Sequence, residues 1–534
     1  MQAQRAAITA QYGPAIGAVV GGATTLALAI WVHWAWWIVA APLLGLVVLA
    51  IFDFFQREHS VWRSYPILGH GRWLMEAVRP ELQQYFIERD TDGLPFDRDT
   101  RSLVYERAKD TREDEPFGTQ LDIYAEGHEY VEHSLAPLPP LDDLRVRVGG
   151  PDCTRPYDMS LFNISAMSFG SLSGNAISAL SRGAAAGRFL HDTGEGGLTR
   201  YHLDGGADLS WEIGSGYYGC RTATGSFDPE QFAAKAAHPQ VVASCIKLSQ
   251  GAKPGRGGVM PAAKVTDEIA EIRGVPVGVK CESPAAHTAF STPLGLVEFV
   301  AQLRELSDGK PVGFKLCVGR RREFLAICQA MLATGVTPDF IVVDGAEGGT
   351  GAAPLEFEDH VGTPLTEGLI FVHNALVGCG LRDRIKIGCS GKVATGFSIV
   401  ARLAQGADFT YSARGMMFAV GCIQAMRCHN NTCPVGVATQ DPARTRALVV
   451  GDKADRVAKF HANTVASALS LLAAMGLDGT ERLGPHLLRR RVSPETTKTY
   501  DDLYHYLEPD QLLSLPPADW VDDWEAADPA TFGP

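Results

Sequence analysis

Short apolar runs alternate with helical stretches from about residue 159 onward, and this alternation constrains the fold more than any other feature of the chain. Seven runs that end in glycine, serine or charged residues predict strands: 160–167, 187–195, 242–250, 311–318, 339–346, 385–391 and 408–415. A further candidate is 276–283, and helical patterns occupy 292–307, 321–334, 365–378 and 396–405. Alternating helices and buried-type strands form parallel sheets. Seven or eight such units predict an α/β fold, a (β/α)8 TIM barrel.

A doubly wound sheet is the competing fold for the same pattern. It would place a G-x-G-x-x-G fingerprint after the first strand. The chain has M-S-F-G-S-L-S-G at 167–174 instead. The barrel is therefore favoured.

Composition narrows the class of protein. Apolar residues make up 46% of the 534 residues and charged residues 20%, which excludes disorder over the whole chain. The formal net charge of −13 argues against nucleic acid as a partner. Glycine is in surplus, with 56 residues, and this indicates many loops whose backbone lines a binding site.

The N-terminal segment has a different composition from the rest. Residues 6–52 contain no Asp, Glu, Lys or Arg, and 15–52 are almost all apolar. Since one pass through a bilayer takes about 20 helical residues, the segment predicts a two-helix transmembrane hairpin with passes near 15–32 and 36–52. Tryptophans gather at its turn: Trp31, Trp34, Trp36 and Trp37. Arginines lie only outside it: Arg5, Arg57, Arg63 and Arg72.

This distribution of arginines predicts that both ends of the hairpin face the cytoplasm. The expected location is the cell (inner) membrane, with membrane lipid as a partner and the catalytic domain facing the cytoplasm. Two alternatives stay open. A cleaved signal peptide would have a shorter apolar run and more positive charge before it. A buried hairpin of a soluble protein is the other.

Changes in composition divide the chain into four regions. They are a transmembrane hairpin at 1–53, a polar connecting region at 54–140, the barrel at 141–480 and a C-terminal tail at 481–534. In the connecting region, R-P-E-L-Q-Q-Y-F-I at 79–87 predicts a helix start with Pro80 in its first turn. The V-D-D-W-E-A-A-D run at 521–528 is typical of a solvated tail, while two arrangements stay open for the segment after about 480, packed on the barrel or trailing from it.

In a (β/α)8 barrel the chemistry lies at the carboxyl ends of the strands. The residues that fall there are Ser168, Glu195, Gln250, Lys315 and Asp344, with the glycines that follow, among them Gly348 and Gly349. Lys315 stands in a strand that is otherwise apolar on both sides. It would carry positive charge toward a reduced flavin or a substrate carboxylate, or its ammonium would reach solvent at the barrel mouth. Gln250 and Lys247 leave the same choice between a ligand contact and ordinary loop polarity.

The last two predicted strands end in C-S-G-K-V-A-T-G (389–396) and S-A-R-G-M-M (412–417). Barrels often bind phosphate in the loops after strands seven and eight. Gly391 and Gly415 would let backbone N–H groups approach a phosphate, and Lys392 or Arg414 would add positive charge. The pattern indicates a phosphorylated cofactor, although glycines also end loops in barrels that bind none.

The 11 cysteines are scattered, and an odd number in a large chain facing the cytoplasm favours free thiols. Three differ from the rest, because Cys422, Cys428 and Cys433 are spaced C-x5-C-x4-C-P. Three thiolates this close can hold a three-iron cluster, or a four-iron cluster that lacks one ligand. Zinc with His429 as a fourth ligand and three buried cysteines are the alternatives.

Across roughly 155–475 the chain resembles the flavin-binding synthase domain of glutamate synthase. The segments that carry the resemblance are M-S-F-G-S-L-S, T-G-E-G-G, I-K-L-S-Q-G-A-K-P-G-R-G-G, D-G-A-E-G-G-T-G-A-A-P, L-R-D-R-I-K-I and C-H-N-N-T-C-P-V-G-V-A-T-Q. This set is long, ordered and specific. Together with the hairpin, it makes the chain similar to the short, membrane-anchored FMN-binding glutamate synthase family proteins.

The resemblance implies FMN in the barrel and a [3Fe–4S] cluster on Cys422, Cys428 and Cys433. It also implies an oxidoreductase acting on CH–NH2 donors, which aminates 2-oxoglutarate or a related 2-oxo acid with ammonia through hydride from reduced FMN. Ferredoxin or a membrane electron donor would supply electrons. The implied FMN contacts are Ser168, Gln250, Lys315, Gly348, Gly349, Gly391 and Gly415. The implied catalytic residues are Lys315, stabilising the reduced flavin, and Glu195, beside the substrate or where ammonia enters.

The chain departs from the family pattern at three places. Arg256 stands where Q-G-A-K-P-G-E-G-G has glutamate, C-V-G-R-R-R-E-F follows Lys315 in place of K-L-V-S-E, and 283–290 drifts. The alternative function is an FMN oxidoreductase on the same barrel that acts on a different amine, imino acid or 2-hydroxy acid. A 2-hydroxy-acid oxidase should show a histidine base paired with an arginine before the phosphate loops, and we find no clear equivalent. A redox-sensing scaffold would not need the full set of flavin loops. Neither a glutaminase domain nor an NADPH-oxidising subunit is expected.

Overall fold

Eight parallel strands close into a barrel in the order β4-β5-β6-β7-β10-β11-β12-β13. The computed structural model describes residues 2–111 and 116–533, with side chains from residue 11 onward. The barrel strands are β4 (Phe162–Ile164), β5 (His191–Asp192), β6 (Leu209–Ile213), β7 (Val241–Lys247), β10 (Val312–Leu316), β11 (Phe340–Asp344), β12 (Lys386–Ser390) and β13 (Phe409–Ser412). Closure comes from β13 and β4, where Tyr411 pairs with Asn163. The predicted (β/α)8 barrel is confirmed.

One predicted strand is wrong and one was missed. Residues 276–283 contribute only β9 (Cys281–Glu282), which pairs antiparallel with β8 (Val259–Met260) outside the barrel. The barrel strand that the sequence did not predict is β6, whose five residues L-S-W-E-I are all buried. Its polar Ser210 and Glu212 alternate with apolar residues and imitate a strand with one solvated face. Glu212 instead points toward a buried lysine.

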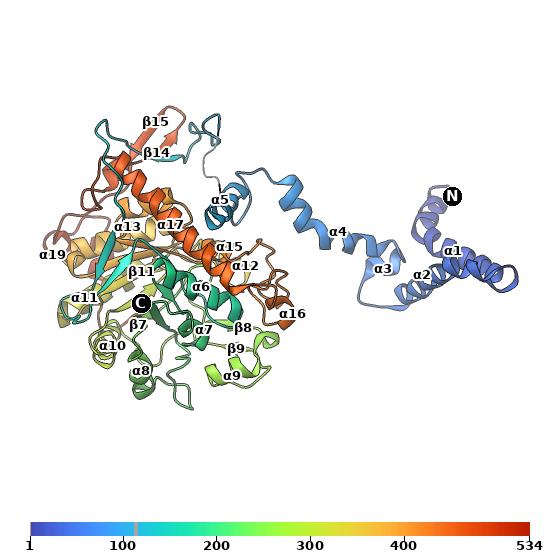
Figure 1. Cartoon of the computed structure of the whole chain (residues 1–534), viewed down its shortest axis with the longest axis horizontal. Helices are drawn as coiled ribbons and strands as arrows, with labels where there is room; N and C mark the ends of the chain where they lie inside the picture. Colours follow the sequence, from blue (N-terminus) through green and yellow to red (C-terminus); the bar gives the residue numbers. More distant parts are fainter. Residues whose placement is uncertain (1, 112–115, 534) are drawn as a thin grey trace. The chain divides into compact units, whose positions relative to one another are not determined.

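Helices cover the outside of the barrel (Figure 1). The long ones are α6 (Gly174–Gly187), α8 (Pro229–Ala236), α10 (Pro293–Leu306), α11 (Arg321–Thr334), α13 (Leu365–Gly378), α14 (Gly396–Ala404) and α17 (Val450–Ala474). The short ones are α7 (Arg200–Leu203), α9 (Asp267–Arg273), α12 (Leu355–His360), α15 (Arg414–Ala419), α16 (Pro442–Thr445), α18 (Tyr500–Leu503), α19 (Gln511–Ser514) and α20 (Val521–Glu525). Small residues let α17 approach α6 closely, because a Cβ added at Gly183 would lie 2.6 Å from Val457.

The unit that contains the barrel runs from Leu94 to the C-terminus, so it includes part of the connecting region. Helix α5 (Arg98–Lys109) packs against α17, and β1 (Glu129–Val131) pairs with β14 (Leu488–Ser493), which pairs with β15 (Thr496–Thr499).

The expectation of a solvated C-terminal tail is wrong. Leu507, Leu512 and Trp520 are buried, and Trp520 stacks on Phe371 of α13 with ring centroids 5.1 Å apart. The acidic run after Trp520 lies on the surface of a docked segment. Its Asp523 is 3.4 Å from Arg321 of α11, so part of the charge that suggested a free tail faces a cation of the barrel unit.

The first unit, residues 1–93, contains two apolar helices that pack against each other. They are α1 (Gln2–Trp31) and α2 (Trp37–Phe55), joined by the short turn η1 (Trp34–Trp36). Stretches Gln11–Trp31 and Trp34–Phe55 are long and apolar enough to cross a membrane. The predicted two-helix hairpin is confirmed, and its insertion in a membrane stays a proposal.

The connecting region continues this first unit with α3 (Ser60–Ser64), α4 (Gly69–Leu82) and the π-helical turn η2 (Gln83–Ile87). The predicted helix start at 79–87 is wrong, because Pro80 lies in the last turn of α4 and the helix begins ten residues earlier, at Gly69. Gly69 and Gly71 make this first turn look like a loop in the sequence.

Candidate active site

A hollow opens at the carboxyl ends of the strands, where loops after β11, β12 and β13 meet residues after β4. Gly348 and Gly349 line it from the loop after β11, and Gly391 and Lys392 line it from the loop after β12. Arg414, after β13, lines it as well. The loops after the last two strands therefore help to form this hollow, and barrels frequently bind phosphate there.

Arg414 is held in one place by its neighbours. Its Nη2 donates a hydrogen bond of 2.7 Å to the carbonyl oxygen of Glu347, and its guanidinium lies 4.9 Å from the ring centroid of Phe96. A Cβ at Gly349 would lie 2.7 Å from Arg414 Nε, so only glycine leaves room for the guanidinium there. Burial lowers the pKa of Arg414, but an arginine remains charged at neutral pH.

Lys392 adds a second cation beside the first. Burial and the nearby Arg414 lower the pKa of Lys392, as expected for a partly buried ammonium beside a second positive charge. Tyr411 also lines the hollow, and its hydroxyl is buried without a hydrogen-bond partner among the described residues. Two cations and glycine backbone line the same hollow, and such donors fit the phosphate of a flavin cofactor.

Gly415 has a different place from Gly391. It lies inside α15, where an added Cβ would be 2.5 Å from Ser412 Oγ and 3.5 Å from the ring of Phe460. Tight helix packing, more than a ligand, accounts for glycine at this position. Gly391 does line the hollow.

Asp344 ties three of the loops together. Ser390 Oγ donates to its Oδ1 at 2.5 Å, and the backbone N–H of Gly251 donates to its Oδ2 at 2.8 Å. A Cβ at Gly251 would collide with the carbonyl oxygen of Gly345. The S-Q-G-A-K-P-G loop, with the half-buried Gln250, is thus packed directly against the D-G-A-E-G-G loop.

Lys315 lies inside the barrel and forms an ion pair with Glu212 of β6. Burial alone would lower the pKa of Lys315, but Glu212, Asp192 and Asp344 outweigh it and the pKa is raised. The ammonium therefore stays protonated. Of the two possibilities left open by the sequence, the structure excludes an ammonium that reaches solvent, since Lys315 is buried.

Asp192, at the end of β5, belongs to the same buried group. Burial and the neighbouring Glu212 raise the pKa of Asp192 to about 7, and its carboxylate accepts a hydrogen bond of 2.9 Å from the N–H of Gly194. Sequence reasoning missed both Asp192 and Glu212. Both could have been found in the sequence, because each is a charged residue in a strand that must be buried. The same observation singled out Lys315.

Glu195 forms a second ion pair, with Lys247 Nζ 2.7 Å from its Oε1. Burial raises the pKa of Glu195, but Lys247 outweighs this and the pKa is lowered. Glycine backbone surrounds the carboxylate, since a Cβ at Gly214 would lie 2.7 Å from Oε2. Nearby Lys253 is buried, and burial together with Lys247 lowers its pKa to about 8. This part of the site presents two lysines around one carboxylate.

Ser168 stands at the junction of the β4 loop with α9. Its Oγ donates to Ser171 Oγ at 3.1 Å and accepts from Arg273 Nη2 at 3.4 Å. The T-G-E-G-G loop packs on it, because a Cβ at Gly196 would lie 2.7 Å from Ser168 Cβ. Arg273 was not singled out from the sequence, since it lies on a short helix far from the recognised motifs.

The three spaced cysteines lie near one another, in a loop after α15. Burial, with a smaller contribution from Cys428 and Cys433, raises the pKa of Cys422 to about 12. Within residues 2–111 and 116–533, no three His, Cys, Asp or Glu side chains are placed so that they could hold a metal ion. The three thiols suit an iron–sulfur cluster in kind, and a cluster on them stays a proposal.

This cysteine loop is tied to the loop that carries Ser168. Gln440 Nε2 donates to the carbonyl oxygens of Gly170 at 3.1 Å and Leu172 at 2.9 Å. Lys264 Nζ donates to the carbonyl oxygen of Ser171 at 3.0 Å. The cysteines are therefore held at the edge of the candidate site.

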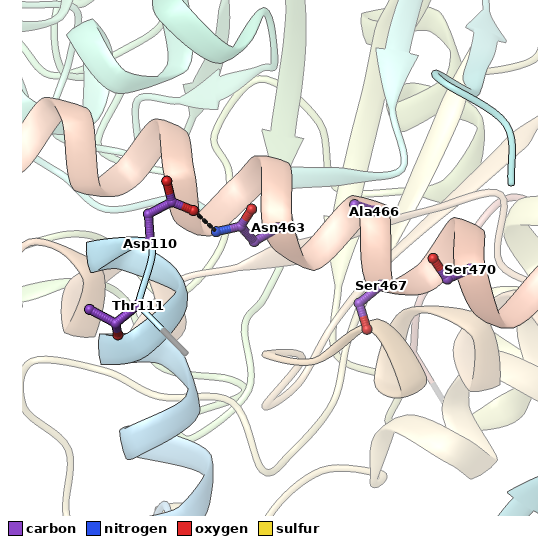
Figure 2. A pocket seen from close by; sticks show the side chains of 6 residues that line it. All are labelled: Asp110, Thr111, Asn463, Ala466, Ser467 and Ser470. Carbon is purple, nitrogen blue, oxygen red and sulfur yellow. Dashed lines mark hydrogen bonds between the residues drawn. The ribbon is translucent and has the colours of Figure 1, made fainter. Parts of the chain in front are cut away.

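A second hollow lies between the end of α5 and α17 (Figure 2). Asp110 and Asn463 line it and are joined by a hydrogen bond of 3.3 Å from Nδ2 to Oδ1. The other lining residues are Thr111, Ala466, Ser467 and Ser470. No lysine, arginine or histidine is among these lining residues, and we assign the chemistry to the hollow at the strand ends.

Comparisons with known proteins agree with this architecture. Residues 154–478 match the family described as the conserved region in glutamate synthase. A glutamate synthase large subunit-like protein, YerD of Bacillus subtilis, is 37% identical over 88% of this chain and 97% of its own length. An archaeal-type glutamate synthase [NADPH] of Thermotoga neapolitana is 33% identical over 60% of each chain. The chain belongs to the glutamate synthase family.

Among solved structures, a mutant flavocytochrome b2 with pyruvate bound aligns over 76% of this chain and 88% of its own, at 13% identity and a TM-score of 0.41. A score this low carries no weight here, and the barrel rests on its own strand pairing.

Proposed function

We propose that the protein is an FMN-dependent oxidoreductase of the glutamate synthase type. It would aminate 2-oxoglutarate, or a related 2-oxo acid, with ammonia, so that the C=O carbon becomes CH–NH2 with the uptake of two electrons and two protons and the release of water. The observation that carries the proposal is the glycine-lined hollow with Lys392 and Arg414, found in a chain of this family. FMN, when bound, supplies the hydride.

In this proposal, Lys392 and Arg414 bind the phosphate of FMN together with the backbone of Gly349 and Gly391. Lys315 provides a fixed positive charge inside the barrel, close to Asp344 of the hollow. A permanent charge that need not reorganise is an effective way to stabilise developing negative charge. Gln250 and Ser168 stay proposed contacts of the flavin.

The second ion pair suits a dicarboxylate. Lys247 is oriented by Glu195, and Lys253 brings another ammonium whose pKa of about 8 leaves it mostly protonated at neutral pH. These two cations would hold the carboxylates of the 2-oxo acid. Glu195 would accept a hydrogen bond from ammonia or the substrate.

We further propose a [3Fe–4S] cluster on Cys422, Cys428 and Cys433, with electrons from ferredoxin or a membrane donor. The hairpin would anchor the protein in the cell membrane with the barrel unit on the cytoplasmic side. The support is the cysteine spacing for the cluster, and the length and apolar composition of α1 and α2 for the membrane.

Cofactor content and reoxidation test the enzyme proposal. Purified full-length protein in detergent should contain one FMN and three irons per chain. After photoreduction without oxygen, 2-oxoglutarate plus ammonium should restore the oxidised flavin absorbance faster than either compound alone, and succinate plus ammonium serves as the control. A flavin-free preparation that resists reconstitution, or a reoxidation rate that neither compound changes, would overturn the proposal.

One residue favours a second candidate, an FMN oxidoreductase for another amine, imino acid or 2-hydroxy acid. Arg256, where the related motif has glutamate, lies with its guanidinium 5.3 Å from the ring centroid of Phe357 of α12. It adds positive charge to the loop that carries Lys253. Reduction of the bound flavin by one of these substrates, in the absence of 2-oxo acid, would identify this activity.

A further inference from the structure

An apolar stripe runs along α4 and η2 in the first unit. Leu74, Val78, Leu82 and Phe86 recur every four residues, and Met75 lies beside Leu74. Side chains at this spacing share one face of a helix. All are exposed, from 37% for Val78 to 81% for Phe86. A continuous apolar face of this kind marks an interaction surface.

The opposite face of α4 carries a charged pair and a contact with α3. Arg72 Nε donates to Glu76 Oε1 at 2.9 Å. Trp73 packs edge-on against Trp62 of α3, with ring centroids 6.1 Å apart. The charged pair and the contact with α3 are therefore turned away from the stripe, which contains no charged residue.

A buried carboxylate fixes the start of α4 to the end of α2. Asp53, in the last turn of α2, is fully buried. Its Oδ1 is 2.8 Å from His70 Nε2, and its Oδ2 accepts a hydrogen bond of 2.9 Å from the N–H of Ile67. Ile67 has a φ of 70°, which a β-branched residue rarely adopts, so this turn is held by its contacts.

The length of α2 places this junction at a membrane boundary. Helix α2 has 19 residues, so it is about 28 Å long, close to the roughly 30 Å of a bilayer core. With the tryptophan turn at one interface, Asp53 reaches the other. The amphipathic helix α4 thus starts where a membrane-spanning helix would leave the bilayer.

We propose that α4 and η2 lie in the plane of the membrane interface, with the stripe inserted between lipid headgroups and acyl chains. The partner is the lipid bilayer itself. Residues 54–93 carry five arginines against six carboxylates, so apolar burial drives the contact and anionic lipid is not needed. The proposal rests on the membrane anchoring in the proposed function and is independent of the enzymatic activity.

Photocrosslinking from defined positions tests the proposal. The full chain is placed in nanodiscs of phosphatidylcholine alone, with benzoylphenylalanine introduced at Leu82 on the stripe, at Glu76 on the opposite face, or at the exposed Val48 of α2. Irradiation and mass spectrometry of the peptides identify what each position touches. Position 82 should yield several-fold more lipid adduct than position 76, because only the apolar face of an interfacial helix enters the lipid, and position 48 should yield lipid adduct as well.

The other outcomes separate the possible occupants. Crosslinks from position 82 to peptides of 94–533 would show that the stripe docks on the barrel unit. Crosslinks to a second chain would show self-association. Either result, or equal lipid adducts at 82 and 76, would overturn the proposal. If position 48 forms no lipid adduct, membrane anchoring itself is wrong and the interfacial helix is wrong with it, while the FMN and substrate tests still stand.

Discussion

Lys315 and Glu212 form an ion pair inside the barrel that joins β10 to β6 across the intervening strand β7. Both side chains are almost inaccessible to solvent, with 6% and 1% of their surface exposed. Asp192 and Asp344 add to the negative charge around the lysine. The cation proposed to act on the flavin is thus part of the structural core, and its partners control both charge and stability.

Breaking this pair should destabilise the protein. Glu212→Gln leaves the Lys315 ammonium buried without its carboxylate, which typically costs about 3–5 kcal/mol. We expect the free energy of unfolding of the full chain, measured by urea titration in detergent, to fall by about 3 kcal/mol. The control is Glu132→Gln, which breaks a much more exposed pair with Arg489 and should cost less than about 1 kcal/mol. Equal losses for the two variants would contradict the prediction.

Asp192 should make stability depend on pH. Burial and Glu212 raise its pKa from 3.8 to about 7. Between these two pKa values the carboxyl of Asp192 is protonated in the folded protein and ionised in the unfolded chain. The protonated carboxyl therefore contributes fully to stability below pH 3.8, and this contribution is lost as the pH rises through the folded-state pKa of about 7. Asp192→Asn removes this loss. The difference in unfolding free energy between the Asp192→Asn variant and the unaltered chain should therefore shift in favour of the variant by about 1–3 kcal/mol from about pH 5 to about pH 8.

The measurement is a series of urea titrations across that range. Asp158→Asn is the control, because this carboxylate is exposed and paired with Arg147. The unfolding free energy of this variant should change with pH as that of the unaltered chain does. If the unfolding free energy of Asp192→Asn also changes with pH as that of the unaltered chain does, the carboxyl of Asp192 is not protonated in the native state.

Lys392 should contribute to FMN affinity. It lies just past the carboxyl end of β12, beside Arg414, whereas Lys386 lies at the opposite end of the same strand. A charge-assisted hydrogen bond to phosphate is worth about 1.5–3 kcal/mol, so Lys392→Ala should weaken FMN binding by roughly 10- to 100-fold. Fluorescence titration of deflavinated protein with FMN measures this. Lys386→Ala should leave the affinity unchanged, and similar affinities for both variants would place the phosphate elsewhere.

The cysteine motif should determine iron content more than flavin content. Cys428→Ser removes one proposed ligand, and we expect most of the iron to be lost while FMN per chain changes little. Iron assay and flavin absorbance on the same preparation give both values. Cys153→Ser, a thiol outside the motif whose Sγ lies 3.3 Å from the carbonyl oxygen of Gly309, is the control. Iron loss in both variants, or in neither, would contradict a cluster on the motif.

Local sequence patterns predicted those parts of the fold that depend on short-range periodicity. The run 339–346 contains a buried strand because its residues 340–343 are all apolar, and glycines such as Gly391 mark loop ends. Strand β6 was missed because Ser210 and Glu212 interrupt its apolar residues. Whether a polar residue in a strand faces solvent or a buried counter-charge depends on a residue more than 100 positions away, here Lys315.

The same reasoning applies to the C-terminal segment and to the site. In the sequence, Trp520 and its acidic neighbours are typical of a solvated segment. In the folded chain, Trp520 packs against Arg321 of α11 and Phe371 of α13. Glu195 was recognised from its motif, but Lys247 became its partner only through the closure of the barrel.

Periodicity, composition and motifs along the chain are enough to predict the alternation of strands and helices, the apolar hairpin and the family. Tertiary structure alone decided which charges meet. It joined Lys315 to Glu212 and Asp192, made the loops after β11, β12 and β13 one hollow, and fixed α4 to the end of α2 through Asp53. The physical reason is that burial and pairing of a charge depend on distances between segments far apart in the sequence, which only the folded chain sets.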